Sequence, residues 1–363
     1  MKRFFSYICI LLSVFTTIGC TKNEKLTNIN EFKMNKAIAT VNKYMTAYTN
    51  NDFSKMQQLY GKSLKKEASG SQQSALKITS YKIMDTTEMG TTANIRVNVI
   101  RSDQNSPYTS IDTDIFKIKK SKGKYLIEKI SSTNDKEVFQ YKRNLMVKIK
   151  DEAKSNILIN LVGVPEYYFS KGDPLKIDKI KVSKDGFSFL SASNDGNMAI
   201  ISTAGANPLI GVCEIQDLEQ QGGGNGGNGQ NASQSQSDQS LSDESQPFQV
   251  AAKSIKVIDV YKNAQVKDIA YSNDDGIIAV QCLENNSMRI KMYEAQSGDL
   301  VSKQVDKKFP ADKFDLTLVK FDEKYLIFDS KPRNANEPKS KDKAGQWRVN
   351  LKTYKVSKAK GKS

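Results

Sequence analysis

Short apolar runs separated by turn residues fill the second half of the chain, and they constrain its fold more than any other feature. Lys184–Gly186, Asn194–Gly196 and Asn273–Gly276 each lie between two such runs and end on glycine. Glycine adopts the positive φ that a tight hairpin turn needs, so each segment predicts a turn between antiparallel strands. A weaker copy of the same pattern runs from Leu316 to Leu351.

The repeated units resemble the blades of a β-propeller. A blade takes about 40–45 residues and a closed propeller about four to eight blades, so residues 176–363 barely suffice for closure. We therefore expect a mainly-β domain over residues 176–363, either propeller-like or a sandwich.

Residues 220–246 interrupt this domain with a segment rich in Gly, Asn, Gln and Ser. Such a composition cannot form a core, so we expect a disordered loop there.

The first part of the chain carries helix signals followed by strand signals. Apolar residues from Met34 to Tyr48 recur at steps of three and four, which is the period of one helical face. Asp52 is a good N-cap for a second helix. From Leu76 the period changes to two, and Ser121–Lys124 separates two further runs as a hairpin turn does.

These segments resemble the NTF2-like family. The resemblance rests on Tyr44–Tyr48, Asn51–Phe53, Met56–Tyr60 and the hairpin Phe116–Ile127, and it covers residues 31–140. It implies an α+β domain in which a cone-shaped sheet wraps around helices and encloses a pocket. Enzymatic members usually use an Asp–His or similar pair in the cone, and this chain contains no histidine. We interpret residues 141–175 as a connector whose apolar residues fit either a short helix or a strand.

The N-terminus has the pattern of an export signal. Lys2 and Arg3 precede an apolar run from Phe4 to Ile18 that is shorter than the roughly 20 residues of a membrane-spanning helix. The run closes on Thr17-Ile18-Gly19-Cys20, which resembles the lipobox of bacterial lipoproteins.

The lipobox resemblance implies a signal peptide over residues 1–19, cleaved between Gly19 and Cys20, and a diacylglyceryl group on the Cys20 thiol. Residues 20–30 are then a polar tether. A lipidated cysteine of this class carries at least two acyl chains, which hold a protein stably at a membrane. An ordinary secretory signal and an uncleaved N-terminal anchor are the alternatives.

The net charge of the chain indicates which classes of partner it could attract. The formal net charge of +15 would favour nucleic acid for an intracellular protein, but export makes a nucleic-acid partner unexpected. We expect a solvated basic surface that is attracted secondarily to anionic lipid headgroups or acidic wall polymers.

Patterns that carry catalysis or metal binding are not found in the sequence. Without histidine, and with Cys213 and Cys282 as the remaining cysteines of the folded part, zinc spacing is not available. Asp112 and Asp114 share strand parity and could form a carboxylate pair in the cone, but we expect them to be solvated. Cys213 and Cys282 lie in strand-like runs, so we expect buried free thiols, with a disulfide as the alternative.

The sequence therefore predicts an α+β NTF2-like domain followed by a mainly-β propeller-like or sandwich domain, in a lipoprotein at the extracytoplasmic face of the cell membrane. We expect a non-enzymatic binding or assembly module of the cell envelope, without a cofactor, whose partners are the membrane and an envelope protein. A lipoprotein that binds a small ligand in its cone is the second hypothesis, and a hydrolase is the third. The sequence assigns no ligand-binding residues.

Overall fold

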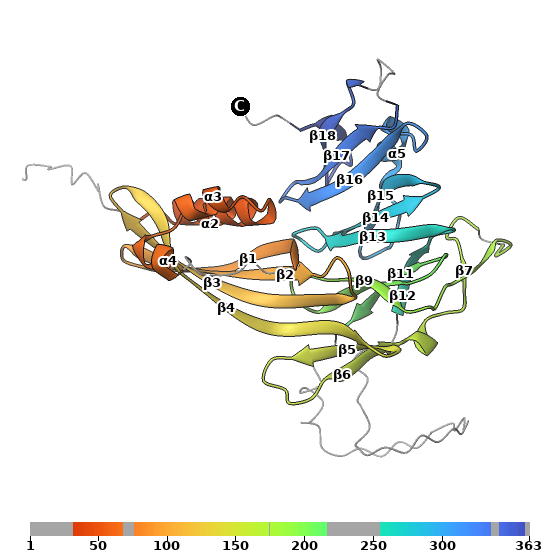
Figure 1. The fold of residues 1–363 in the computed structure, drawn as a ribbon, viewed down its shortest axis with the longest axis horizontal. Helices are drawn as coiled ribbons and strands as arrows, with labels where there is room; N and C mark the ends of the chain where they lie inside the picture. Colours follow the sequence, from red (N-terminus) through yellow and green to blue (C-terminus); the bar gives the residue numbers. More distant parts are fainter. Residues whose placement is uncertain (1–31, 68–75, 174, 216–254, 335–340, 360–363) are drawn as a thin grey trace, which may run out of the picture. The chain divides into compact units, whose positions relative to one another are not determined.

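The computed structural model describes residues 32–67, 76–173, 175–215, 255–334 and 341–359 (Figure 1). The chain separates into Met1–Lys33 and a compact unit, Met34–Ser363, to which the elements below belong. Gly19, Cys20 and the expected loop 220–246 lie outside the described residues. The described part is mainly β-strand. Within it, no helix is both long and apolar enough to cross a membrane.

Three helices open the unit: α2 (Met34–Thr49), α3 (Phe53–Gln58) and α4 (Lys62–Glu67). The first two were predicted, from the apolar period and from the Asp52 cap, and α4 was not. The buried face of α2 includes Val41, Tyr44 and Met45. Asp52 caps α3 as expected, because its carboxylate accepts the backbone N–H of Lys55 at 3.1 Å.

A six-stranded antiparallel sheet follows, with its strands in sequence order. It consists of β1 (Lys77–Met89), β2 (Thr92–Ser102), β3 (Tyr108–Ser121), β4 (Lys124–Tyr141), β5 (Asn144–Ile149) and β6 (Asn156–Asn160). The sheet thus continues past residue 140, where we expected a connector to begin. The reason is tertiary: Val147 of β5 pairs with Val138 of β4, and both belong to a core shared with β9, β10 and β11.

The rest of the described chain is built of consecutive antiparallel strands. After a 3₁₀ turn, η2 (Leu161–Gly163), come a two-stranded hairpin and three further sheets. The hairpin is β7 (Tyr167–Phe169) and β8 (Lys179–Lys181). The first sheet is β9 (Phe187–Ala192), β10 (Met198–Thr203), β11 (Leu209–Glu214) and β12 (Ile255–Val260). The second is β13 (Ala264–Tyr271), β14 (Ile277–Glu284) and β15 (Ser287–Glu294). After α5 (Lys303–Lys308), the third is β16 (Phe314–Phe321), β17 (Tyr325–Pro332), β18 (Gly345–Asn350) and β19 (Val356–Lys358).

The predicted turns differ in outcome. Asn194–Gly196 joins the paired strands β9 and β10, with Gly196 at φ +74°. Asn273–Gly276 joins β13 and β14, but there Asp275 takes the positive φ of 59°. Lys184–Gly186 was predicted wrongly as a hairpin, because β8 pairs with β7 and not with β9.

The six-stranded sheet packs on both faces. On one face Phe116 of β3 contacts Tyr44 of α2, with ring centroids 5.4 Å apart. On the other face Ile100 and Ile111 pack against Ala192 of β9. Strands β1, β2 and β3 contact β9, β13 and β16, which are the first strands of the three later sheets. The described residues supply three sheets of this kind, fewer than the four or so that close a propeller, and the six-stranded sheet packs against their first strands.

Candidate functional site

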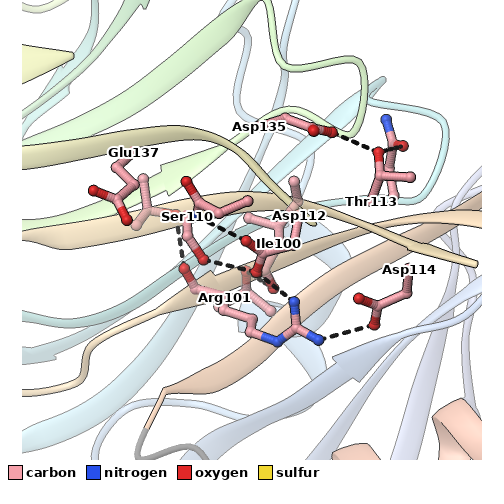
Figure 2. A network of polar contacts seen from close by, with 12 residues as sticks. Ile100, Arg101, Ser110, Asp112, Thr113, Asp114, Asp135 and Glu137 are labelled. Carbon is pink, nitrogen blue, oxygen red and sulfur yellow. Dashed lines mark hydrogen bonds and ion pairs between the residues drawn. The ribbon is translucent and has the colours of Figure 1, made fainter. Parts of the chain in front are cut away.

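A buried ion-pair network lies on the face of the six-stranded sheet that is turned toward α2. Arg101 is the last residue but one of β2. Asp112 and Asp114 lie on the neighbouring strand β3, opposite Val99 and Val97. Figure 2 shows the guanidinium between the two carboxylates. Arg101 donates to Asp112 Oδ2, and its Nη2 lies 2.9 Å from Asp114 Oδ2.

The expectation that Asp112 and Asp114 are solvated is wrong. Their exposed fractions are 7% and 3%. A buried carboxylate needs a compensating charge, and here the charge comes from Arg101 on another strand, where the sequence of β3 alone cannot reveal it. Burial lowers the pKa of Arg101, but Asp114 and Asp112 outweigh burial and raise it above its ordinary value.

Hydrogen bonds complete the network on one side. The Ser110 hydroxyl donates to Asp112 Oδ2 at 3.0 Å, and the Asn134 amide donates to Asp112 Oδ1 at 2.8 Å. Asp114 Oδ1, in contrast, is buried without a hydrogen-bond partner in the described part of the chain. Asp112 therefore accepts more hydrogen bonds than Asp114 does, although both carboxylates pair with the guanidinium of Arg101.

A cluster of aromatic rings lies beside the ion-pair network, between α2 and the sheet. A general acid or base must reach a substrate, and both carboxylates are buried on the side of the sheet where these rings pack. Tyr44 lies 6.0 Å from Tyr48, 6.1 Å from Tyr60 and 5.4 Å from Phe116, measured between ring centroids. Burial, together with Tyr60, raises the pKa of the Tyr44 hydroxyl.

A second polar network links the opposite face of the sheet to the turns of the later sheets. Asn194, fully buried in the β9–β10 turn, is its centre. Its backbone and side-chain amides donate to Asp275 Oδ1 at 2.7 and 2.8 Å, and its side chain also donates to Ser272 O at 3.1 Å. From the six-stranded sheet, the Ser80 hydroxyl donates to Asn194 Oδ1 at 2.7 Å, and Asn98 donates to Asn194 O at 2.8 Å. One asparagine thus joins three sheets.

Beside this network lies an open cavity of about 660 Å³, which we call the turn cleft. One wall comes from α2 and β1, and the other from the β13–β14 and β16–β17 turns. Its lining residues are Asn42, Tyr81, Lys82, Ile83, Asn273, Asp274, Asp322, Glu323, Lys324 and Tyr325. A second cavity of about 710 Å³ shares Asp274, Glu323 and Lys324 with it.

The turns fix two of the cleft's acids in place. Asp322 Oδ1 accepts the backbone N–H groups of Lys324 and Tyr325 at 2.8 and 2.7 Å. Asp274 Oδ1 accepts the Ser272 hydroxyl at 2.6 Å and the Gly276 N–H at 3.2 Å. Each aspartate therefore caps its own turn with one oxygen. The sequence shows these residues only as turn formers, and no local signal brings the two turns together.

The acidic turns do not form a metal site. Among the described residues, no group of three or more His, Cys, Asp or Glu side chains could hold a metal ion.

Cys213 and Cys282 are free and buried, as expected, in β11 and β14. Burial raises the pKa of each thiol to about 12. Because the thiolate is the reactive form, neither cysteine is suited to be a nucleophile at neutral pH.

No protein-family model matches the chain, and no curated protein matches it. Among solved structures, the chain is similar to the β-propeller domain of a Myceliophteria thermophila protein, with 10% identity and a TM-score of 0.27 over 78% of this chain and 84% of that one. It is also similar to a prolyl endopeptidase, with 8% identity and a TM-score of 0.25 over 88% of this chain and 53% of that one. TM-scores this low support no argument about function.

Proposed function

We propose that this chain is a membrane-anchored extracytoplasmic lipoprotein that acts as a non-enzymatic binding or assembly module of the cell envelope. The anchor is argued from the sequence alone: an apolar run that ends on Gly19-Cys20 and is followed by a polar stretch. Lipid on Cys20 would hold a basic protein at the membrane surface, where anionic headgroups add attraction.

One observation carries the non-enzymatic part of the proposal. Asp112 and Asp114, which the sequence offers as a carboxylate pair, share the guanidinium of Arg101 in a buried site. A carboxylate engaged in this way is a poor general base, because proton transfer would break its ion pair. The two buried cysteines add no nucleophile.

The proposal extends to the fold. We propose an NTF2-like arrangement for the helices and the six-stranded sheet, and an incomplete propeller-like arrangement for the three later sheets. The order of elements, helices before an antiparallel meander, supports the first. The consecutive antiparallel sheets support the second.

A small ligand inside the cone is the weaker alternative. Tyr44, Tyr60 and Phe116 pack against one another between the helices and the sheet, where such a ligand would lie. If the protein binds a small ligand, the turn cleft offers a better site.

The anchor is tested by metabolic labelling with a palmitate analogue and by cell fractionation, in wild type and in Cys20→Ala. We expect the label and the membrane association in wild type, and loss of both in the variant. Cys9→Ala is the matched control and should keep both, because Cys9 lies in the expected signal peptide. Equal labelling of wild type and Cys20→Ala would rule out lipidation at this residue.

A further inference from the structure

The turn cleft is a preformed cavity whose walls are tied together. Its β1 wall is joined to the later sheets by the Ser80–Asn194 hydrogen bond and by the ion pair between Lys77 and Asp268. Its opposite wall consists of turns that Asp274 and Asp322 cap from within. Preformed walls reduce the ordering cost of binding, so the cleft is suited to hold a ligand.

The charge of the lining is negative, although the chain as a whole is strongly basic. The lining contains three carboxylates, Asp274, Asp322 and Glu323, and two lysines, Lys82 and Lys324. No ion pair joins these five side chains to a partner in the described part of the chain. Asp274 and Asp322 each keep one carboxylate oxygen outside the turn hydrogen bonds.

Lys82 also lies near a fourth carboxylate, that of Asp275 in the β13–β14 turn. Burial raises the pKa of Asp275, and the nearby charge of Lys82 opposes that shift. Hydrogen bonds from Asn194 oppose it more strongly than Lys82 does. The lining itself carries three carboxylates against two lysines, which leaves one negative charge in excess. The excess of negative charge favours a cationic ligand over an anionic one.

Aromatic and aliphatic side chains stand beside the carboxylates. Tyr81 and Ile83 project from β1, and Tyr325 follows the β16–β17 turn. Burial raises the pKa of Tyr81, and the negative charges of Glu323 and Asp322 add to this shift. A hydrogen bond with Thr46 opposes the shift. Glu323 and Asp322 therefore lie close enough to act on the Tyr81 hydroxyl across the cleft.

We infer that the turn cleft binds an aliphatic amine or guanidinium cation, the group that ends a lysine or arginine side chain or a free polyamine. The cationic part of the ligand lies along the two acidic turns, which carry Asp322, Glu323 and Asp274, where charge-assisted hydrogen bonds hold it. The aliphatic stem lies against Tyr81 and Ile83, and a tyrosine face adds cation–π attraction. The inference deepens the binding role proposed above by naming the chemistry of the ligand.

Calorimetric titration of the purified full-length protein in detergent tests this inference with two cationic probes. Spermidine represents the free polyamine, and the peptide acetyl-(Ala-Lys)₃-amide represents the basic side chain. The matched peptide acetyl-(Ala-Glu)₃-amide is the control for charge. We expect saturable binding of at least one cation that weakens with added salt, and none of the acidic peptide. Binding of one cation but not the other identifies the source and supports the inference.

Substitutions locate the binding. Glu323→Gln and Asp322→Asn remove one charge each, and asparagine keeps the Oδ1 that caps the turn. We expect each to weaken cation binding about tenfold, as loss of one charge-assisted hydrogen bond does. Glu88→Gln, on the exposed end of β1, is the matched control and should bind as wild type does. Thermal unfolding of each variant verifies that it is folded.

Two results would overturn the inference: no saturable binding of either cation, or equal affinities in Glu323→Gln, Asp322→Asn and Glu88→Gln. Neither result bears on the anchor, because the labelling of Cys20 is measured separately in cells.

Discussion

At the scale of single residues, Arg101 determines what the two acids of β3 can do. Its guanidinium compensates both buried carboxylates, and its own exposed fraction is 9%. Strand parity predicted that Asp112 and Asp114 share a face, and this is confirmed. Their burial was not predictable, because it depends on a cation that projects from the neighbouring strand.

Replacing Arg101 should therefore destabilise the protein strongly. In Arg101→Met, two carboxylates remain buried without a compensating charge, which typically costs about 3–5 kcal/mol. Urea unfolding followed by circular dichroism measures the loss. Arg96→Met is the control, because the Arg96–Asp85 pair on the same sheet is about half exposed and should contribute about 0–1 kcal/mol. Similar losses in the two variants would contradict the compensating role of Arg101.

At the scale of elements, the sequence predicted what local signals determine. The period of three and four gives α2, and the hairpin Ser121–Lys124 joins β3 and β4, with Lys122 and Gly123 at positive φ. Elements that depend on distant contacts were missed. Helix α5 has no side-chain hydrogen bond at its N-cap Ser302. Arg289 of β15 holds it instead, donating to Phe309 O at 2.8 Å and to Asp306.

The glycines of the β9–β10 turn and of the Lys184–Gly186 segment differ in backbone conformation. Gly196 has φ +74°, and an added Cβ would meet Ile111 only at ordinary contact distance. Gly196→Ala should therefore cost about 1–2 kcal/mol for the left-handed backbone alone. Gly186 has no positive φ and space around it, so Gly186→Ala should be neutral or stabilise by about 0.4–1 kcal/mol. Urea unfolding of both variants tests this, and equal losses would mean that the two turns share one backbone conformation.

At the scale of the whole compact unit, the helix-and-sheet part and the later sheets share their interior. One core cluster contains Val138 and Leu145 of the six-stranded sheet together with Ile201 and Cys213 of the next sheet. The turn network of Asn194 adds buried hydrogen bonds across the same contact. The two parts that the sequence treats as separate domains are thus packed against each other through apolar and polar groups.

The core of the six-stranded sheet and β9–β12 is followed by a second core between β10–β12 and β13–β15, and by a third between β13–β15 and β16–β19. Such adjoining cores predict one cooperative unfolding transition for both parts. Trp347 of β18 is the single tryptophan of the chain, so its fluorescence reports on the sheet of β16–β19. Hydrogen exchange of the β2 and β3 amides reports on the six-stranded sheet. If the core couples the two parts, both signals should change at the same urea concentration.

The variant Asn194→Ala tests the contact between the two parts, because it removes the hydrogen bonds to Ser80 and Asp275. It should lower the urea concentration of the transition for both signals together. Two separated transitions in wild type would show instead that each part is stable on its own, and that the contact between them contributes little to either.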